Sequence, residues 1–309
     1  MNKYKVENEF AFIKNRKMEQ KKSHSDIQGK VCVISGCTSG VGLETLKKLA
    51  WGKADIIMVS RNKEKAERIQ DEIFASYNVK PEIVIADFSS LSDVRRAANE
   101  IIKKRDRIDI LINSAGVHST KRIITEDGFE LVFCVNHLSS FLLTVLLIDL
   151  LKKSNQGRII QVNSEGHRFG GLNLNDLSWK KRPYIGLRSY GASKTAQIMS
   201  VIKLSEILKE TNVTINAAHP GGVRTNIGNN NGWLYKLWLK NVVWHFLKEP
   251  EISGESLYYL ASAPELKEIT GKYFNLTIEE MPAPHVFKEG LIDKMFEVSL
   301  ELTSCRDLF

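Results

Sequence analysis

A tyrosine and a lysine four residues apart are the side chains of this sequence best suited to acid–base chemistry. On a helix, Tyr190 and Lys194 lie on one face at this spacing. A tyrosine has an unperturbed pKa of about 10, and a neighbouring ammonium favours the phenolate and so lowers that pKa. The two side chains can therefore work as one unit that donates and accepts a proton near neutral pH.

Polar residues that follow predicted strands are expected to meet this pair. Ligands bind beyond the carboxyl ends of parallel strands, so Ser164, after a strand predicted at 158–162, can hydrogen-bond a substrate oxygen. Asn113-Ser114-Ala115-Gly116 closes another strand and faces the same crevice. Asn136 lies inside a predicted helix, where asparagine is unfavourable; this indicates a polar task or a structural hydrogen bond.

A glycine-rich loop is the second chemical feature. A β-branched run at 31–35 leads directly into this loop, and helical spacing of apolar residues begins after it. Glycines permit a tight turn and close approach to a pyrophosphate, and a helix N-terminus offers free N–H groups and a positive dipole end. The strand before it and the helix after it predict a dinucleotide-binding loop rather than a simple turn. Its predicted ligand residues are Ser35, Gly36, Thr38, Ser39, Gly40, Val41 and Gly42.

The end of the second predicted strand indicates which dinucleotide is bound. An NAD site usually places an acidic residue there to hold the ribose 2′-hydroxyl. Here Arg61 follows the strand directly, and Asp55 lies at its opposite end. Arg61 can make a forked, charge-assisted contact with a 2′-phosphate, so we expect NADP(H) in preference to NAD(H). The alternative is that Arg61 is an ordinary surface arginine.

The elements that must position these residues alternate along the chain. Short apolar runs alternate with amphipathic helical patterns, including one at 92–104 with Ser92 as its expected N-cap. This alternation predicts an α/β fold: a single Rossmann-type doubly wound domain with a mainly parallel sheet and helices on both faces. We assign it to 29–309, after a basic polar extension at 1–28. Strands are predicted at 31–35, 56–60, 82–86, 109–112, 158–162, 213–218 and 273–275, and helices at 42–51, 63–77, 92–104, 128–153, 187–209, 253–263 and 293–303.

Composition narrows the function classes. The 309 residues are 43% hydrophobic, enough for a sizeable core, and the net charge of +8 fits a solvated basic surface. There is no nucleic-acid-binding motif, and the four cysteines form no metal-binding spacing, so we expect neither nucleic acid nor a metal as a ligand. The first 29 residues lack the apolar core of a signal peptide, and the apolar run at 141–151 is short enough to be a buried helix. We therefore expect a cytoplasmic protein.

Together these motifs resemble those of the short-chain dehydrogenases/reductases. The G-x-x-x-G-x-G loop, Asn136, Ser164 and the Tyr190/Lys194 pair match that family, with Ser35 where its members usually carry threonine. Four short sequence motifs, at 135–138, 141–144, 219–221 and 296–303, resemble those of the retinol-dehydrogenase-like branch. Members of that branch often carry an apolar N-terminal anchor, whereas residues 1–28 are polar.

The resemblance implies a role for each matching residue. Tyr190 would be the general acid/base, and Lys194 would lower its pKa and bind the nicotinamide ribose. Ser164 would orient the substrate carbonyl, and Asn136 would support a water in a proton relay. Further cofactor contacts are implied for Asp87 at the adenine, for Asn113, Ala115 and Gly116 after the fourth strand, and for Pro220, Gly221, Val223 and Thr225 on the nicotinamide side.

The resemblance also implies a reaction and partners. It predicts hydride transfer between NADP(H) and the carbonyl or alcohol of a lipophilic substrate such as a retinoid, steroid or fatty aldehyde, in a homodimer. A substrate lid is expected at 226–250. Within it, 229–247 carries three tryptophans and two lysines, which suit an apolar pocket wall, peripheral contact with a membrane surface, or plain packing.

Two other functions are compatible with a dinucleotide fold. One is a catalytically silent NADP(H)-binding regulatory protein, which the intact set of Asn136, Ser164, Tyr190 and Lys194 disfavours. The other is a sugar-nucleotide epimerase or dehydratase, whose members usually show a G-x-x-G-x-x-G loop instead of the spacing found here. The sequence therefore favours an oxidoreductase.

Overall fold

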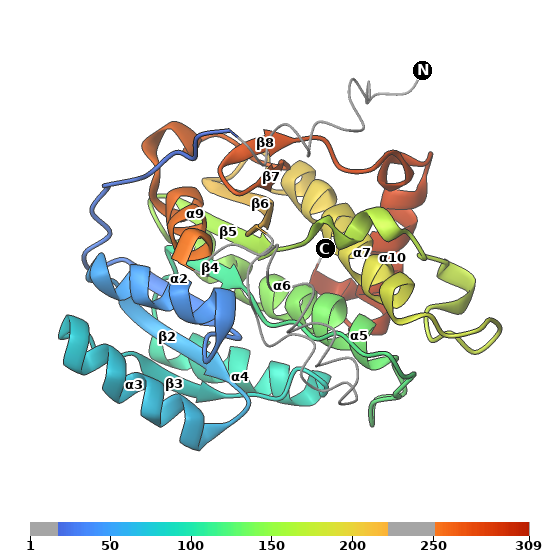
Figure 1. The fold of residues 1–309 in the computed structure, drawn as a ribbon, viewed down its shortest axis with the longest axis horizontal. Helices are drawn as coiled ribbons and strands as arrows, with labels where there is room; N and C mark the ends of the chain where they lie inside the picture. Colours follow the sequence, from blue (N-terminus) through green and yellow to red (C-terminus); the bar gives the residue numbers. More distant parts are fainter. Residues whose placement is uncertain (1–17, 222–250, 309) are drawn as a thin grey trace.

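A mainly parallel sheet is the centre of the fold. The computed structural model describes residues 18–221 and 251–308, and within them eight strands form one sheet in the order β3-β2-β1-β4-β5-β6-β7-β8 (Figure 1). Neighbouring strands run parallel except β7 and β8, which pair antiparallel. The strands are β1 (Val31–Ser35), β2 (Asp55–Ser60), β3 (Glu82–Ile85), β4 (Ile110–Asn113), β5 (Gly157–Val162), β6 (Val213–His219), β7 (Tyr273–Asn275) and β8 (Ile278–Glu280).

Helices cover both faces of this sheet, as the sequence predicts for a doubly wound α/β domain. One buried apolar cluster joins the sheet to α4, α6, α7 and α10, and a second joins it to α2, α3 and α9. Because both faces are covered, the central strands are continuous apolar runs rather than alternating ones. The helices are α2 (Gly40–Trp51), α3 (Lys63–Tyr77), α4 (Leu91–Lys104), α5 (Leu131–Phe133), α6 (Ser139–Lys152), α7 (Gly186–Ile207), α9 (Glu251–Ser262) and α10 (Leu291–Leu302).

Two local predictions were wrong, and one strand was missed. Ser90, not Ser92, caps α4, because its extended backbone lets its hydroxyl accept the Asp93 N–H. The single helix expected at 128–153 begins at Leu131 and is interrupted by a π-helical turn at Cys134–Leu138, which sequence periodicity does not reveal. Strand β8 was not predicted, because only one of its three residues is apolar.

The apolar helical stretch is a core element. Among the described residues, Leu131–Lys152 is the one helical stretch long and apolar enough to cross a membrane, and 89% of its most apolar 18-residue window is buried inside the fold. Its buried side chains pack with the sheet in the larger apolar cluster. The prediction that 141–151 forms a buried helix is therefore confirmed.

The described part of the N-terminal extension lies along the sheet edge and α9. The Ser25 carbonyl accepts the Tyr258 hydroxyl at 2.8 Å, and Ile27 is buried. Farther along, the Lys21 N–H donates to the Thr277 hydroxyl at 2.9 Å, next to β8. Residues 18–28 thus contact the domain over most of their length.

Candidate active site

The carboxyl ends of the central strands open into one cleft of about 520 Å³. Predicted site residues from seven separate segments meet there, from the loop after β1 to the segment after β6. The predicted residues in its lining are Gly36, Thr38, Ser39, Gly40, Val41, Gly42, Arg61, Asp87, Ala115, Gly116, Ser164, Tyr190, Lys194, Pro220 and Gly221. Val223, Thr225 and the expected lid at 226–250 lie outside the described residues.

Close backbone packing shapes the glycine-rich loop. Gly36 has φ +66°, and a Cβ there would lie 2.5 Å from the Ala115 Cα atom. A Cβ on Gly42 would collide with the Gly36 carbonyl. The Ser35 hydroxyl accepts the N–H groups of Ser114 and Ala115, both at 3.2 Å. Ser35 therefore lies behind the cleft wall and fastens the loop to the turn after β4.

The N-terminus of α2 is open to an anion. Asn62 and Ser90 use their side chains to cap α3 and α4, whereas Ser39 makes no side-chain capping bond to α2. The first N–H groups of α2 and its positive dipole end are therefore available to a pyrophosphate. The loop, its missing Cβ atoms and this helix end together fit a dinucleotide.

Two cations lie at the end of β2. Arg61 and Lys65 both line the cleft, and neither forms a salt bridge with another described residue. Asn62 accepts the Lys65 N–H at 2.7 Å, which starts α3 at this point. Lys65 was not singled out from the sequence, although its place four residues after Arg61 at the start of a helix was a usable signal.

The Tyr190 ring is held by contacts on two sides. A Cβ on Gly166 would lie 2.6 Å from the ring, so that glycine is what allows the close approach. The His118 ring meets it edge-on, with 5.8 Å between ring centres. Burial raises the Tyr190 pKa to about 12, against the smaller opposing effect of a hydrogen bond with the Ser164 side chain. That hydrogen bond connects the proposed acid/base to the residue expected to hold the substrate oxygen.

Lys194 is buried beside this ring. Its ammonium nitrogen lies 5.6 Å from the centre of the Tyr190 ring and donates to the Val162 carbonyl and to Gln197 Oε1, both at 3.0 Å. Burial lowers the Lys194 pKa to about 7. In the structure, desolvation therefore works against the charged form of both side chains, and the Tyr190 pKa moves in the direction opposite to the one expected from the four-residue spacing alone.

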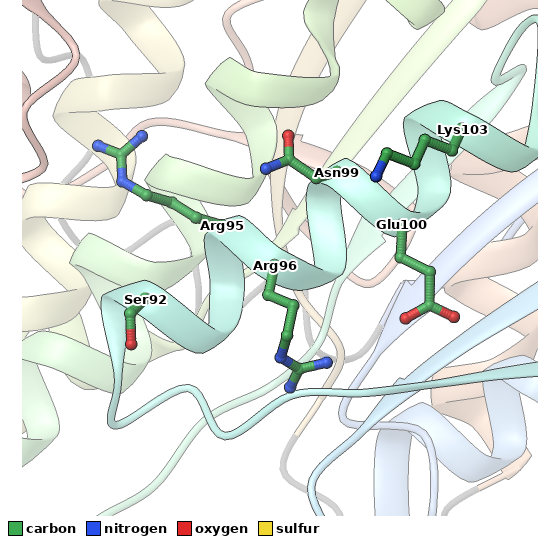
Figure 2. A pocket seen from close by; sticks show the side chains of 6 residues that line it. All are labelled: Ser92, Arg95, Arg96, Asn99, Glu100 and Lys103. Atoms are coloured by element: carbon green, nitrogen blue, oxygen red, sulfur yellow. The ribbon is translucent and has the colours of Figure 1, made fainter.

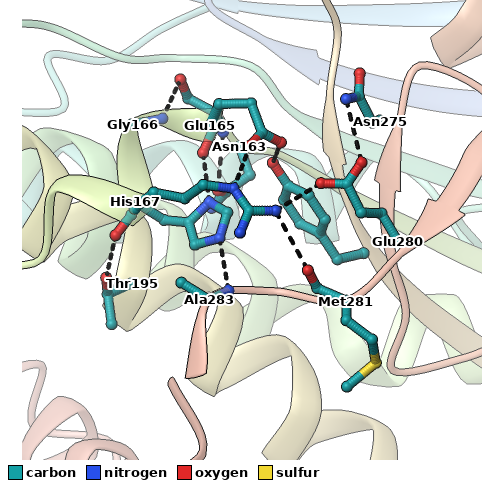
Figure 3. Close-up of polar contacts among 12 residues, drawn as sticks. Asn163, Glu165, Gly166, His167, Thr195, Asn275, Glu280, Met281 and Ala283 are labelled. Carbon is teal, nitrogen blue, oxygen red and sulfur yellow. Dashed lines mark hydrogen bonds and ion pairs between the residues drawn. The ribbon is translucent and has the colours of Figure 1, made fainter. Parts of the chain in front are cut away.

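An ionic network connects the loop that carries Ser164 to strands β7 and β8 (Figure 3). Arg168 pairs with Glu165 at 2.5 Å and with Glu280 of β8 at 2.6 Å, while the Tyr273 hydroxyl of β7 donates to Glu165 at 2.8 Å. These contacts tie the loop after β5 to the β7–β8 hairpin. Strand β8, which was not predicted, thus helps to hold the loop that carries Ser164.

His167 belongs to this support rather than to the cleft lining. Its Nε2 accepts the Ala283 N–H at 3.0 Å, so its Nδ1 carries the proton and donates to the Ser164 carbonyl at 2.8 Å (Figure 3). Burial lowers the His167 pKa to about 4, which keeps the ring neutral near pH 7. The ring therefore stabilises the backbone at Ser164.

Asn113 and Asn136 lie behind the cleft wall. Asn113 donates to the Thr144 hydroxyl at 2.8 Å, which joins β4 to α6. Asn136, in the π-helical turn, accepts the Val117 N–H at 2.7 Å and donates to the Ser193 hydroxyl at 3.0 Å. Such turns often occur at functional sites. Asn136 holds the segment after β4 against the helix that carries Tyr190 and Lys194.

A second cavity, of about 530 Å³, lies along α4 (Figure 2). Its lining side chains all come from that one helix, among them Arg95, Arg96 and Lys103. Arg96 is engaged by Asp93 and by the Ile85 carbonyl, and Arg95 by the Thr303 and Ser304 carbonyls. This cavity contains none of the predicted site residues, and its charged lining is that of a solvated helix face.

Known proteins are similar to this chain in both sequence and fold. The family model described as short chain dehydrogenase matches residues 30–232. The chain is 37% identical to retinol dehydrogenase 13 of Homo sapiens over 285 residues, 91% of this chain and 86% of that protein. It is 36% identical to human retinol dehydrogenase 14, covering 88% of this chain and 86% of that protein. The chain belongs to the short-chain dehydrogenase family.

Within this short-chain dehydrogenase family, the chain falls in the retinol-dehydrogenase-like branch, as its motifs predicted. A crystal structure of an uncharacterised protein from Mycobacterium Paratuberculosis superimposes with a TM-score of 0.73 at 26% identity, covering 91% of this chain and 95% of that one. The Rossmann-type fold is therefore confirmed, and the chain is an oxidoreductase of a family that uses nicotinamide cofactors.

Proposed function

We propose that this dehydrogenase transfers a hydride between NADP(H) and the carbonyl or alcohol carbon of a lipophilic substrate. The observation that carries the proposal is the single cleft in which the glycine-rich loop, Arg61, Ser164, Tyr190 and Lys194 meet. The loop and the open N-terminus of α2 suit the pyrophosphate. The acid/base pair lies at the other end of the same cleft, where a nicotinamide ring would reach.

The chain's own residues would handle the proton and the substrate oxygen. When bound, the reduced nicotinamide supplies the hydride for carbonyl reduction. Ser164 hydrogen-bonds the carbonyl oxygen, and the Tyr190 phenol donates the proton that this oxygen gains. The Lys194 ammonium stabilises the phenolate left behind. Asn136 holds the surrounding backbone, and the same groups run the alcohol oxidation in reverse.

Apolar side chains near the acid/base pair support a lipophilic substrate. Leu187 and Ile185 lie on the turn of chain just before Tyr190, and their exposed fractions are 52% and 46%. Phe169, 54% exposed, packs beside Gly191, the residue after Tyr190. Large apolar side chains exposed in the segments beside Tyr190 suit a long aldehyde or alcohol better than a sugar.

A substrate series tests this proposal. Purified protein with NADPH is assayed for loss of nicotinamide absorbance against straight-chain aldehydes of increasing length, and against retinal. We expect kcat/KM to rise with chain length, since each buried methylene contributes about 0.8 kcal/mol. No turnover with any aldehyde, together with intact NADPH binding, would leave the silent cofactor-binding protein as the better description.

We expect Arg61→Asp to move cofactor preference from NADP(H) toward NAD(H). The substitution removes a charge-assisted contact with the 2′-phosphate and adds a repulsive carboxylate. A lost hydrogen bond to a charged group is worth about 1.5–3 kcal/mol, so the ratio of kcat/KM for NADPH to that for NADH should fall roughly 10- to 100-fold. Lys65 would retain part of the preference.

The matched control is Arg68→Asp on α3, the helix that follows Arg61. Arg68 is 67% exposed and pairs with Glu72, and it is not part of the cleft lining. It changes the net charge by the same amount, so it should leave the cofactor ratio unchanged. Equal ratios for Arg61→Asp and the wild-type protein would disprove recognition of the phosphate by Arg61.

Two assembly properties are also proposed, on the basis of sequence alone. The segment 229–247 lies outside the described residues; its tryptophans and lysines would dock the protein peripherally on a membrane surface from the cytoplasmic side. We expect co-flotation of the wild-type protein with anionic liposomes and its loss on replacing Trp233, Trp238 and Trp244 with serine. Absence of wild-type co-flotation would end this proposal.

A homodimer is also proposed, because the family resemblance implies it. A measurement of the molecular mass in solution tests this.

A further inference from the structure

A buried glutamine lies between two residues of the proposed catalytic set. Gln197 is on α7, one turn after Lys194, and its exposed fraction is 2%. Its side-chain oxygen accepts from Lys194 Nζ at 3.0 Å and from Asn163 Nδ2 at 3.1 Å. Its side-chain nitrogen donates to the main-chain carbonyl of Asn136. The carboxamide therefore joins the ammonium of Lys194 to the π-helical turn that carries Asn136.

The orientation of this carboxamide follows from its partners. An ammonium can only donate, so the atom facing Lys194 must be the oxygen of Gln197. A main-chain carbonyl can only accept, so the atom facing Asn136 must be the nitrogen. If the amide were reversed, its nitrogen would face two donors, Lys194 and Asn163. Its oxygen would face the Asn136 carbonyl, which is also an acceptor. One arrangement therefore satisfies every group, and it fixes the ammonium at a defined place.

The remaining contacts show why the ammonium needs this partner. Lys194 is 3% exposed and has one other described acceptor, the Val162 carbonyl at 3.0 Å. Without Gln197 the buried charge would keep one described protein acceptor for its three N–H donors. Asn163, which holds both the Gln197 oxygen and the Lys194 carbonyl, fixes the glutamine from the β5 side.

We propose that Gln197 is a positioning residue of the active site, whose carboxamide holds the Lys194 ammonium beside Tyr190 and couples it to the Asn136 carbonyl. The proposal rests on the acid/base role of Tyr190 and Lys194 in the proposed function. It replaces part of the expected arrangement, in which a water would be held at Asn136, with a side chain of the protein itself. Gln197 is not part of the cleft lining, so its effect passes through Lys194.

The first test is Gln197→Leu, with Gln161→Leu as its matched control. Gln161 on β5 is also buried and makes a hydrogen bond to the Ser140 hydroxyl at 3.4 Å, whereas the Lys194 ammonium donates to Val162 and Gln197. We expect Gln197→Leu to lower kcat about tenfold or more with little change in KM. In the alcohol-oxidation direction, its rate should rise at higher pH than that of the wild-type protein, because a less stable ammonium favours the phenolate less. Gln161→Leu should keep the wild-type pH profile.

The second test, Gln197→Glu, keeps the shape of the side chain and guards against a folding defect. A carboxylate would pair with Lys194, cancel its field at Tyr190 and raise the Lys194 pKa. We therefore expect two changes: an oxidation profile shifted to higher pH, and a flatter pH dependence of the free energy of unfolding between pH 7 and 9 without cofactor. The other titratable groups near the pair, His118, His167 and His219, are common to all variants and cancel in the comparison.

These readouts separate the two proposals. The unfolding measurement needs no turnover, so it reports on the Gln197–Lys194 contact even if no substrate is found and the proposed function fails. If the wild-type enzyme turns over and both Gln197 variants retain its pH profile, the positioning role is overturned. The same holds if Gln197→Glu shows the wild-type pH dependence of unfolding.

Discussion

Tyr190→Phe should abolish turnover while NADPH binding persists. The substitution removes only the hydroxyl that carries the transferable proton, and general acid–base catalysis contributes typically about 10²- to 10⁴-fold. The phenyl ring can keep its contacts with Gly166 and with the edge of His118, so the shape of the cleft is preserved. We expect kcat to fall by at least about 10²-fold, measured as NADPH consumption with the best aldehyde of the series.

The control for this loss is another tyrosine whose hydroxyl is bonded elsewhere. Tyr258 lies on α9 and donates to the Ser25 carbonyl at 2.8 Å, away from the cleft lining. Tyr258→Phe removes the same atom from a buried tyrosine and should leave kcat near that of the wild-type protein. NADPH affinity, followed by fluorescence titration, should be similar in all three proteins. Substantial turnover by Tyr190→Phe would show that another group supplies the proton.

Features defined by local sequence were predictable. The bounds of β1, α3 and β7 agree with the predicted ranges, because each is set by a short apolar run or a helical period between clear turn residues. The glycine-rich loop was identifiable because its glycines follow a strand and precede a helix. Fifteen of the predicted site residues then meet in one cleft, because parallel strands bring their carboxyl ends together.

Features set by tertiary contacts were not predictable. Ser90 and Ser92 carry the same hydroxyl, and only the backbone geometry at Ser90 decides which one caps α4. The π-helical turn around Asn136 leaves no periodic trace in a helix that is apolar on almost every side. Gln197 reads as an ordinary helical residue until the fold brings Asn163 and Asn136 to it from two other elements.

The four-residue spacing of Tyr190 and Lys194 also could not predict that both side chains are buried. Four-residue separation predicts that an ammonium lowers the pKa of Tyr190, whereas the structure shows desolvation acting on both groups. The ammonium's effect on Tyr190 and the desolvation of both groups are compatible if the ammonium stabilises the phenolate mainly at the moment when it forms. The pKa of Lys194 at about 7 then makes its protonation near neutral pH depend on the contacts that hold it, which is why Gln197 and Val162 matter.

Lys194→Met should remove activity as completely as the loss of the tyrosine hydroxyl. Methionine matches the length of the lysine stem but carries no charge, so the phenolate of Tyr190 loses its stabilising neighbour. We expect kcat/KM to fall by about 10²-fold or more, with weaker cofactor binding where the ammonium would contact the ribose. Lys203→Met on the same helix is the control, because Lys203 lies at the surface and pairs with Asp293 and Glu206.

The same substitution should change how stability depends on pH. Burial lowers the Lys194 pKa from 10.5 to about 7, so between those values the unfolded chain binds more protons than the folded one. The free energy of unfolding of the wild-type protein should therefore gain up to about 1.4 kcal/mol per pH unit from this residue as the pH rises from 7 toward 10. The gain is lost progressively as the pH falls from about 10 to 7.

Denaturant titrations at pH 7, 8 and 9 measure this contribution directly. Lys194→Met lacks the titrating group, so the stability difference, wild type minus variant, should increase with pH across this window. Lys203→Met should show no such increase, because its salt bridges favour the charged form of the folded protein and give the opposite sign. Parallel curves for the wild-type protein and Lys194→Met would mean that Lys194 is not desolvated, and the reason for a positioning glutamine beside it would disappear.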